Sequence, residues 1–173
     1  AILVTNSNVE LEIADSEYGK RRHECQDALD AMQQVPLYHV LSLRDATLQD
    51  CKDAEAKMND ATIYARAKHV VTENTRTTEC KTALKLGVWD RVGELMNASH
   101  ASLRDDFAVS CEEIDFLDDT AQALDGELGS SQTGGEIGGS TVTMVKTEKV
   151  EEMKELLLLK RMRILWYMFK IRI

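Results

Sequence analysis

The sequence predicts an α+β domain in which a few-stranded sheet is covered by helices. Two short β-branched, apolar runs lie near the ends of the chain, at residues 1–5 and 141–145, and several segments with helical spacing separate them. Strands and helices do not alternate regularly, so a doubly wound parallel sheet is not expected. The 173 residues show no internal repeat and suit one domain, or half of a larger protein.

The N-terminal part predicts one strand and one helix. Residues 1–5, AILVT, form a short apolar run that polar residues close, which is typical of a buried strand. Asp15 or Ser16 is available to cap a helix over 19–33, which Pro36 ends. Four apolar residues of that helix follow helical spacing: Cys25, Ala28, Leu29 and Met32. A mixed connector with short helical turns comes next.

The middle of the chain predicts two helices. The longer one covers 60–85, and the shorter one covers 88–99. The apolar stripe of the longer helix comprises Ile63, Ala67, Val70 and Val71. The inward face of the shorter helix comprises Val92, Leu95 and Met96.

The C-terminal part predicts a helix, a strand and another helix. Ser110 and Glu113 fit a capping box that begins the first of these helices, and Gly126 and Gly129 stop it. Residues 141–145, TVTMV, are typical of a strand. A last helix begins at Thr147, and its apolar face comprises Val150, Met153, Leu156 and Leu157.

The charge pattern argues against a nucleic-acid partner. The formal net charge is −9, and all thirty acidic residues precede Leu156, whereas phosphate contacts require basic patches. The four cysteines form no C-x-x-C pair and have no histidine at metal spacing. We therefore expect reduced thiols, a cytoplasmic location and no metal site. The first residues carry no basic leader, so we expect no signal peptide.

The last residues, 156–173, are basic and strongly apolar. The longest charge-free run, 164–169, is far short of the roughly 20 residues that a membrane span requires. A basic amphipathic helix on a membrane or on calmodulin is one interpretation, which we do not favour. The favoured one is a non-homologous end, as from altered splicing or a misplaced reading frame, that forms a helix or replaces a strand. We therefore divide the chain into a domain over 1–150 and a divergent helical tail over 151–173.

A glycine-rich stretch, TGGEIGGSTVTMV, covers 133–145. A Walker loop and a dinucleotide fingerprint are both excluded, because each leads into a helix and this stretch leads into a strand. Two interpretations stay open from the residues alone. The stretch is either a turn at which two backbones approach closely or a nest of amides that binds an anion.

Three ordered blocks resemble galactokinases. The stretch GELMNASHASLRDDFAVSCEEID, 93–115, resembles the family pattern G-x-L-M-x-x-S-H-x-S-L-R-D-D-Y-x-V-S-C-x-E-x-D, with Phe107 at the tyrosine position. VTNSNV with SEYGKRRHEC near the start, and YARAKHVVTENTRT over 64–77, resemble two further blocks. The glycine-rich stretch falls where galactokinases carry the third signature of GHMP sugar and metabolite kinases. The resemblance covers roughly residues 2–150.

This resemblance implies the C-terminal domain of a GHMP kinase and ATP-dependent phosphorylation of galactose at C1 by the whole protein, with ATP and Mg²⁺. It implies that Tyr18 contacts the sugar, although a tyrosine packed at the start of a helix is an alternative. It also implies that four glycines form the loop that closes over the active site and shapes the phosphate region: Gly134, Gly135, Gly138 and Gly139.

The chain lacks several motifs of the family. The sugar-binding signature, the phosphate-cradling loop, the catalytic aspartate and the catalytic arginine have no counterpart in the 173 residues. We therefore expect no catalytic residue and no kinase activity from this chain alone. Galactose and ATP are expected partners if an N-terminal half completes the protein. The alternatives are a non-catalytic, galactose-responsive regulatory protein and a truncated product without function.

The glycine-rich stretch also departs from the family pattern. Glu136 stands where a glycine is usual, and Ser131 and Gln132 replace Arg-Met. These changes make the loop less cationic. At about 4 Å and an effective dielectric near 20, each like-charge contact costs on the order of 4 kcal/mol. The sequence therefore predicts poor binding of a nucleotide's phosphates by this loop.

Two polar groups in the ASHASLRDD segment suggest chemistry. His100 has the character of a general base, but we expect a histidine in a corner between a helix and a loop, hydrogen-bonded to its neighbours. Arg104, Asp105 and Asp106 are expected to form an ion-paired corner that fixes two helices, rather than a catalytic cluster.

Overall fold

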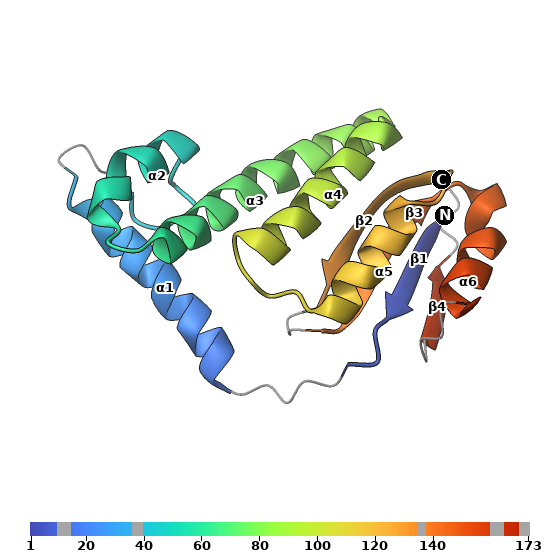
Figure 1. The fold of residues 1–173 in the computed structure, drawn as a ribbon. Helices are drawn as coiled ribbons and strands as arrows, with labels where there is room; N and C mark the ends of the chain where they lie inside the picture. The colour runs from blue at the N-terminus through green and yellow to red at the C-terminus, as the bar shows by residue number, and fades with distance from the viewer. Residues whose placement is uncertain (10–14, 36–39, 135–137, 160–164, 170–173) are drawn as a thin grey trace. The chain divides into compact units, whose positions relative to one another are not determined.

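A computed structural model describes residues 1–9, 15–35, 40–134, 138–159 and 165–169 (Figure 1). The chain divides into two compact units. Unit 1 comprises Ala1–Glu12, Glu79–Arg104 and Ala108–Ile173. Unit 2 comprises Ile13–Thr78 and Asp105–Phe107. None of the described helices is both long enough and apolar enough to cross a membrane.

Unit 1 contains an antiparallel sheet of four strands in the order β2-β3-β1-β4. The strands are β1 (Ile2–Asn6), β2 (Glu127–Thr133), β3 (Ser140–Val145) and β4 (Leu165–Phe169). The two central strands, β1 and β3, coincide with the two predicted strands, and Val4 pairs with Val142 between them. The predicted α+β class with a few-stranded sheet is confirmed.

Helices α5 (Glu112–Gln122) and α6 (Val150–Leu159) pack against one face of this sheet, and the short helix η2 (Thr147–Lys149) precedes α6 (Figure 1). Their shared core comprises Leu3, Leu117, Ala121, Val145, Val150, Met153 and Leu157. The last helix thus lies close to its predicted position. In the tail, the chain continues from α6 into strand β4, which pairs with β1.

The predicted capping box at the start of α5 is wrong. The N-cap residue is Cys111, whose side chain makes no capping hydrogen bond. Ser110 lies one residue too early for that position, and its Oγ instead donates to Oδ1 of Asp115 at 2.5 Å. The serine therefore binds a side chain of the first helical turns rather than a free backbone amide.

Helix α4 (Trp89–Asp105) lies against the outer edge of β2. The backbone N–H of Ser130 donates to Oδ1 of Asn97 at 2.7 Å, and Gly93 meets the backbone of Leu128 and Gly129. A sheet edge that a helix covers in this way cannot pair with another chain. The side-chain amide oxygen of Asn97 thus satisfies a backbone N–H of the strand.

Unit 2 is built from α1 (Asp15–Gln33), α2 (Leu48–Ala54), η1 (Glu55–Lys57) and the first part of α3 (Ala61–Leu86). Its apolar core comprises Ala28, Ala31, Met32, Val40, Leu43, Ala46, Cys51, Ala54, Met58, Ala67 and Val71. Thr47 and Asp50 form a reciprocal capping box at the start of α2. The helices predicted over 19–33 and 60–85 match α1 and α3 to within a few residues.

Candidate functional site

The glycine-rich stretch connects β2 to β3 in a hairpin of unit 1. Gly134, Gly138 and Gly139 have φ angles of 116°, 97° and 83°, a region that side chains with a Cβ rarely adopt. The predicted site residue Gly135 and the substituted Glu136 lie outside the described residues. The stretch leads into a strand, as the sequence predicts.

The C-terminal end of this hairpin is held against the segment that follows β1. The backbone N–H and the Oγ of Ser7 each donate to the carbonyl oxygen of Gly139 at 2.9 Å. A Cβ on Gly138 would lie 3.1 Å from the carbonyl oxygen of Val9. The close backbone approach that one interpretation requires is therefore present at Gly138.

The electrostatic surroundings of the hairpin are not those of a typical phosphate site. Residues 126–145 contain no lysine, arginine or histidine, and residues 1–9 contain none either. The titratable side chain at the start of β2, Glu127, is acidic. Burial, together with the negative charge of Asp118, raises the pKa of Glu127 to about 7. Within these two segments, an anion would find backbone amides and hydroxyl groups but no basic side chain.

Tyr18, the predicted sugar contact, lies on α1 in unit 2. Its side chain is 70% exposed, so it does not pack at the start of a helix. The described hairpin glycines belong to unit 1, and Tyr18 belongs to unit 2. An exposed aromatic ring is free to stack on an apolar sugar face.

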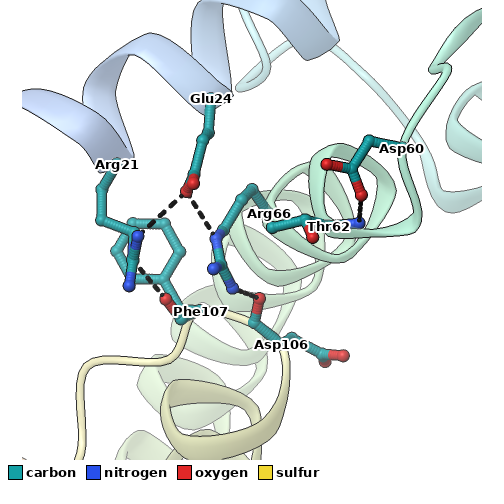
Figure 2. Close-up of polar contacts among 7 residues, drawn as sticks. All are labelled: Arg21, Glu24, Asp60, Thr62, Arg66, Asp106 and Phe107. Atoms are coloured by element: carbon teal, nitrogen blue, oxygen red, sulfur yellow. Dashed lines mark hydrogen bonds and ion pairs between the residues drawn. The ribbon is translucent and has the colours of Figure 1, made fainter.

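A buried ion network, which sequence reasoning missed, lies in unit 2 (Figure 2). Oε2 of Glu24 accepts from Nε of Arg66 at 2.7 Å and from Nη1 of Arg21 at 3.1 Å. Burial alone would raise the pKa of Glu24, but the hydrogen bonds and charges of Arg66 and Arg21 outweigh it and lower that pKa. One carboxylate is therefore shared between two guanidinium groups.

The same two arginines hold the turn at the end of α4 (Figure 2). Nε of Arg21 donates to the carbonyl oxygen of Phe107 at 2.7 Å, and Nη1 of Arg66 donates to that of Asp106 at 2.6 Å. Oδ1 of Asp106 also pairs with Nζ of Lys68 at 2.8 Å. The expected ion-paired corner is thus present at Asp106.

A signal for this network exists in the sequence. Glu24 lies four residues before Ala28, so it shares the buried face of α1, and Arg66 precedes the buried Ala67. Charged residues on the buried face of two neighbouring helices indicate an ion pair. Phe107, at the family's tyrosine position, stacks on His69 with ring centroids 4.4 Å apart.

His100 does not meet the expectation for a corner histidine. Its side chain is 1% exposed, and neither ring nitrogen makes a hydrogen bond. Nε2 lies 3.3 Å from Oδ1 of Asp115 and 3.6 Å from Oδ2 of Asp118. The residue is a buried group facing carboxylates.

The described residues contain no group of three or more His, Cys, Asp or Glu side chains placed to hold a metal ion. All four cysteines are free thiols.

No family model matches the chain. Curated relatives do match it. It is 39% identical over 160 residues to the galactokinase of Mannheimia succiniciproducens, covering 91% of this chain and 40% of the relative. It is 41% identical over 146 residues to the galactokinase of Homo sapiens, covering 84% of this chain and 36% of the relative. The chain thus spans about two-fifths of the length of the relatives that it matches.

Solved structures agree. The crystal structure of Lactococcus lactis galactokinase complexed with galactose superposes with a TM-score of 0.88 at 31% identity, covering 96% of this chain and 44% of that one. The mevalonate kinase of L. major in complex with R-mevalonate superposes with a TM-score of 0.54 at 19% identity, which shows the fold alone. By sequence and by fold, the chain matches the C-terminal half of galactokinases, and its fold is that of the GHMP kinases.

Proposed function

We propose that this chain contributes the C-terminal half of a galactokinase, which transfers the γ-phosphoryl group of ATP to the C1 hydroxyl of galactose. The observation that carries this proposal is the match to L. lactis galactokinase complexed with galactose, which extends over 96% of the chain with a TM-score of 0.88. In this proposal Tyr18 contacts the sugar. The hairpin glycines at 134, 135, 138 and 139 lie next to the phosphate groups.

We further propose that the chain is catalytically silent by itself. Phosphoryl transfer requires positioning and cationic stabilisation of the transferred group. The hairpin and the segment after β1 contribute no basic side chain, and the described residues hold no metal-binding cluster. The base, the cations that neutralise the phosphates and the Mg²⁺ ligands would come from an N-terminal half. The free cysteines suit a cytoplasmic location.

The test is fragment complementation. The purified chain is assayed for ADP release with galactose and ATP, alone and after co-expression with the N-terminal half of L. lactis galactokinase. We expect no rate above background for the chain alone and a galactose-dependent rate for the pair. Turnover by the isolated chain would contradict the proposal of silence, and a stable pair without turnover would contradict the proposed reaction.

A second candidate is a galactose-responsive binding protein without kinase activity. The absence of basic residues from the hairpin favours it, because sugar binding needs no cationic phosphate site. Calorimetry of the complemented pair separates the two candidates. Galactose binding that ATP does not change supports the binding protein, and galactose binding with ATP turnover supports the enzyme.

A further inference from the structure

The buried ring of His100 on α4 faces two carboxylates of α5, of which one is buried and the other partly exposed. The ring is 1% exposed and the side chain of Asp118 is 1% exposed, while that of Asp115 is 28% exposed. Nε2 of His100 lies 3.3 Å from Asp115 and 3.6 Å from Asp118. Both distances fit an ion pair that forms when the ring carries a proton.

The other titratable groups around this contact are acidic. Asp119 of α5 adds negative charge near Asp118, and Glu127 of β2 interacts with Asp118 as well. Two neutral side chains also hydrogen-bond to these carboxylates. Ser110 donates to Asp115, and Nε2 of Gln122 donates to Oδ2 of Asp118 at 2.5 Å. Among the described groups that these contacts bring together, His100 is the one that can supply positive charge.

The buried carboxyl groups of Asp118 and Glu127 are electrostatically unfavourable in their ionised forms. Burial raises the pKa of Asp118, while the charge of His100 and the hydrogen bonds from Ser130 and Gln122 oppose that rise. Oδ1 of Asp118 and Oε1 of Glu127 are buried without a hydrogen bond. A buried charge is costly unless an opposite charge or hydrogen bonds compensate it. The protonation state of His100 therefore decides whether Asp118 faces an opposite charge in addition to its hydrogen bonds.

We propose that His100, Asp115 and Asp118 form a proton-controlled latch that holds α5 to α4. When His100 takes up one proton from solvent, both contacts become ion pairs. When the ring releases that proton as the pH rises, the pairs are lost, and the buried carboxylate of Asp118 no longer faces the positive charge of His100. The latch therefore stabilises the contact between α4 and α5 at low pH and weakens it as the pH rises. This inference does not depend on the proposed function.

A first experiment reads the charge of each ring directly. The whole chain is labelled with ¹³C at histidine, and the Cε1 shifts of its four histidines are followed between pH 5 and 9. In Asp118→Asn, which keeps the shape of the side chain, we expect the ratio of charged to neutral His100 at pH 7 to fall at least tenfold. A change of less than twofold would overturn the proposal.

The chain offers a matched control for this measurement. His23 lies 3.7 Å from Oδ1 of Asp27, with side chains 80% and 45% exposed. Solvent screens such a surface pair. We expect Asp27→Asn to change the charged fraction of His23 by less than twofold, whereas a change as large as that at His100 would show that burial plays no part.

A second experiment measures how the stability of α5 depends on pH. Hydrogen exchange of the α5 amides is measured at pH 5.5 and 8 and corrected for intrinsic rates, in a Glu127→Gln background that removes the proton uptake of that neighbour. We expect protection of α5 to fall at least tenfold between the two pH values, and this fall to vanish when His100→Gln or Asp118→Asn is added. Protection that is independent of pH in the Glu127→Gln chain, or the same fall in both added variants, would overturn the proposal.

Discussion

Gly93 of α4 and Gly129 of β2 meet backbone to backbone: a Cβ on Gly129 would lie 2.3 Å from the Cα of Gly93. A Cβ on Gly93 would lie 1.2 Å from the carbonyl oxygen of Leu128. Neither glycine has a positive φ, so both are needed for space rather than for torsion. This close approach brings Asn97 within reach of the N–H of Ser130.

Gly93→Ala should therefore separate α4 from β2. The added methyl group meets backbone atoms that cannot rotate away, and the hydrogen bond from Ser130 to Asn97 is strained or broken. We expect the free energy of unfolding to fall by about 2–4 kcal/mol, measured by urea denaturation followed by circular dichroism. The matched control is Gly19→Ala in α1, which has no neighbouring atom within 4 Å and should gain about 0.5–1 kcal/mol. Similar effects of the two substitutions would contradict this account.

The same contact explains why β2 was harder to predict than β1 and β3. Its sequence, ELGSSQT, contains a glycine and no β-branched residue except Thr133, so local propensity argues against a strand. Pairing with β3, the cover that α4 provides and the hydrogen bond to Asn97 override that propensity. Because these contacts come from residues far apart in the chain, a pattern of neighbouring residues does not reveal them.

The buried Glu24–Arg66 pair should contribute more to the free energy of unfolding than ion pairs at the surface do. Both side chains are about nine-tenths buried, and truncation of Arg66 leaves the carboxylate paired with Arg21 alone. We expect Arg66→Met to cost about 3–5 kcal/mol of unfolding free energy. Arg91, which pairs with Glu79 and Glu94 at an exposed site, is the control, and Arg91→Ala should cost less than about 1 kcal/mol. Equal losses would mean that burial does not set the strength of the pair.

Acid should weaken unit 2 through Glu24. The pKa of Glu24 in the folded chain lies below its ordinary value, so its ionised form is favoured by folding. That stabilisation is present above the unfolded pKa and is lost as the pH falls through the folded pKa. The protection factors of the α1 amides, corrected for intrinsic exchange rates, should therefore fall on acidification below about pH 4.5, and Glu24→Gln should abolish this dependence. If Glu24→Gln responds to acid as the wild type does, another titrating group causes the response.

Glu127 should produce the opposite pH dependence in unit 1. Its pKa is raised to about 7 by burial and by Asp118, so the folded chain favours the protonated form. The stabilisation is complete below the unfolded pKa near 4.5 and is lost as the pH rises toward 7. Glu127→Gln should thus stabilise the chain at pH 8 by about 1–2 kcal/mol, a value discounted for partial exposure, and have little effect at pH 4. Both stabilities are measured by urea denaturation at pH 4 and pH 8. As a control, Glu155→Gln at an exposed position should change the stability equally at the two pH values.

The candidate site could be predicted in part. The glycine positions and Tyr18 follow from the resemblance of short blocks, and the strand after the glycines follows from the β-branched run at 141–145. The sequence did not reveal Glu24 with Arg66, or His100 with its two carboxylates. These groups lie in separate blocks of the sequence. The position of Glu24 on the buried face of its helix indicates that it has a partner, but only the packing of the helices identifies that partner. The hydrogen bonds expected of His100 are absent because Nε2 lies 3.3 and 3.6 Å from the nearest carboxylate oxygens without hydrogen-bond geometry, and Nδ1 has no partner.

The two interpretations of the hairpin can be separated by comparing Gly138 with Gly134. Alanine at Gly138 faces both a φ of 97° and the carbonyl oxygen of Val9 at 3.1 Å, whereas alanine at Gly134 faces a φ of 116° with no atom within 4 Å. We expect a loss of about 1–2 kcal/mol for Gly134→Ala and about 1 kcal/mol more for Gly138→Ala.

Inorganic phosphate then identifies what the hairpin does. If the hairpin is a turn that permits close approach, the wild type should unfold at the same temperature in 10–50 mM phosphate as in chloride of equal ionic strength. Equal ionic strength gives the same screening in both solutions. If its amides form an anion nest, phosphate should raise the unfolding temperature of the wild type by the mass action of binding, and Gly134→Ala should remove that rise because the amides no longer converge. We expect no rise, because nothing in residues 126–145 or 1–9 adds a cation to the amides.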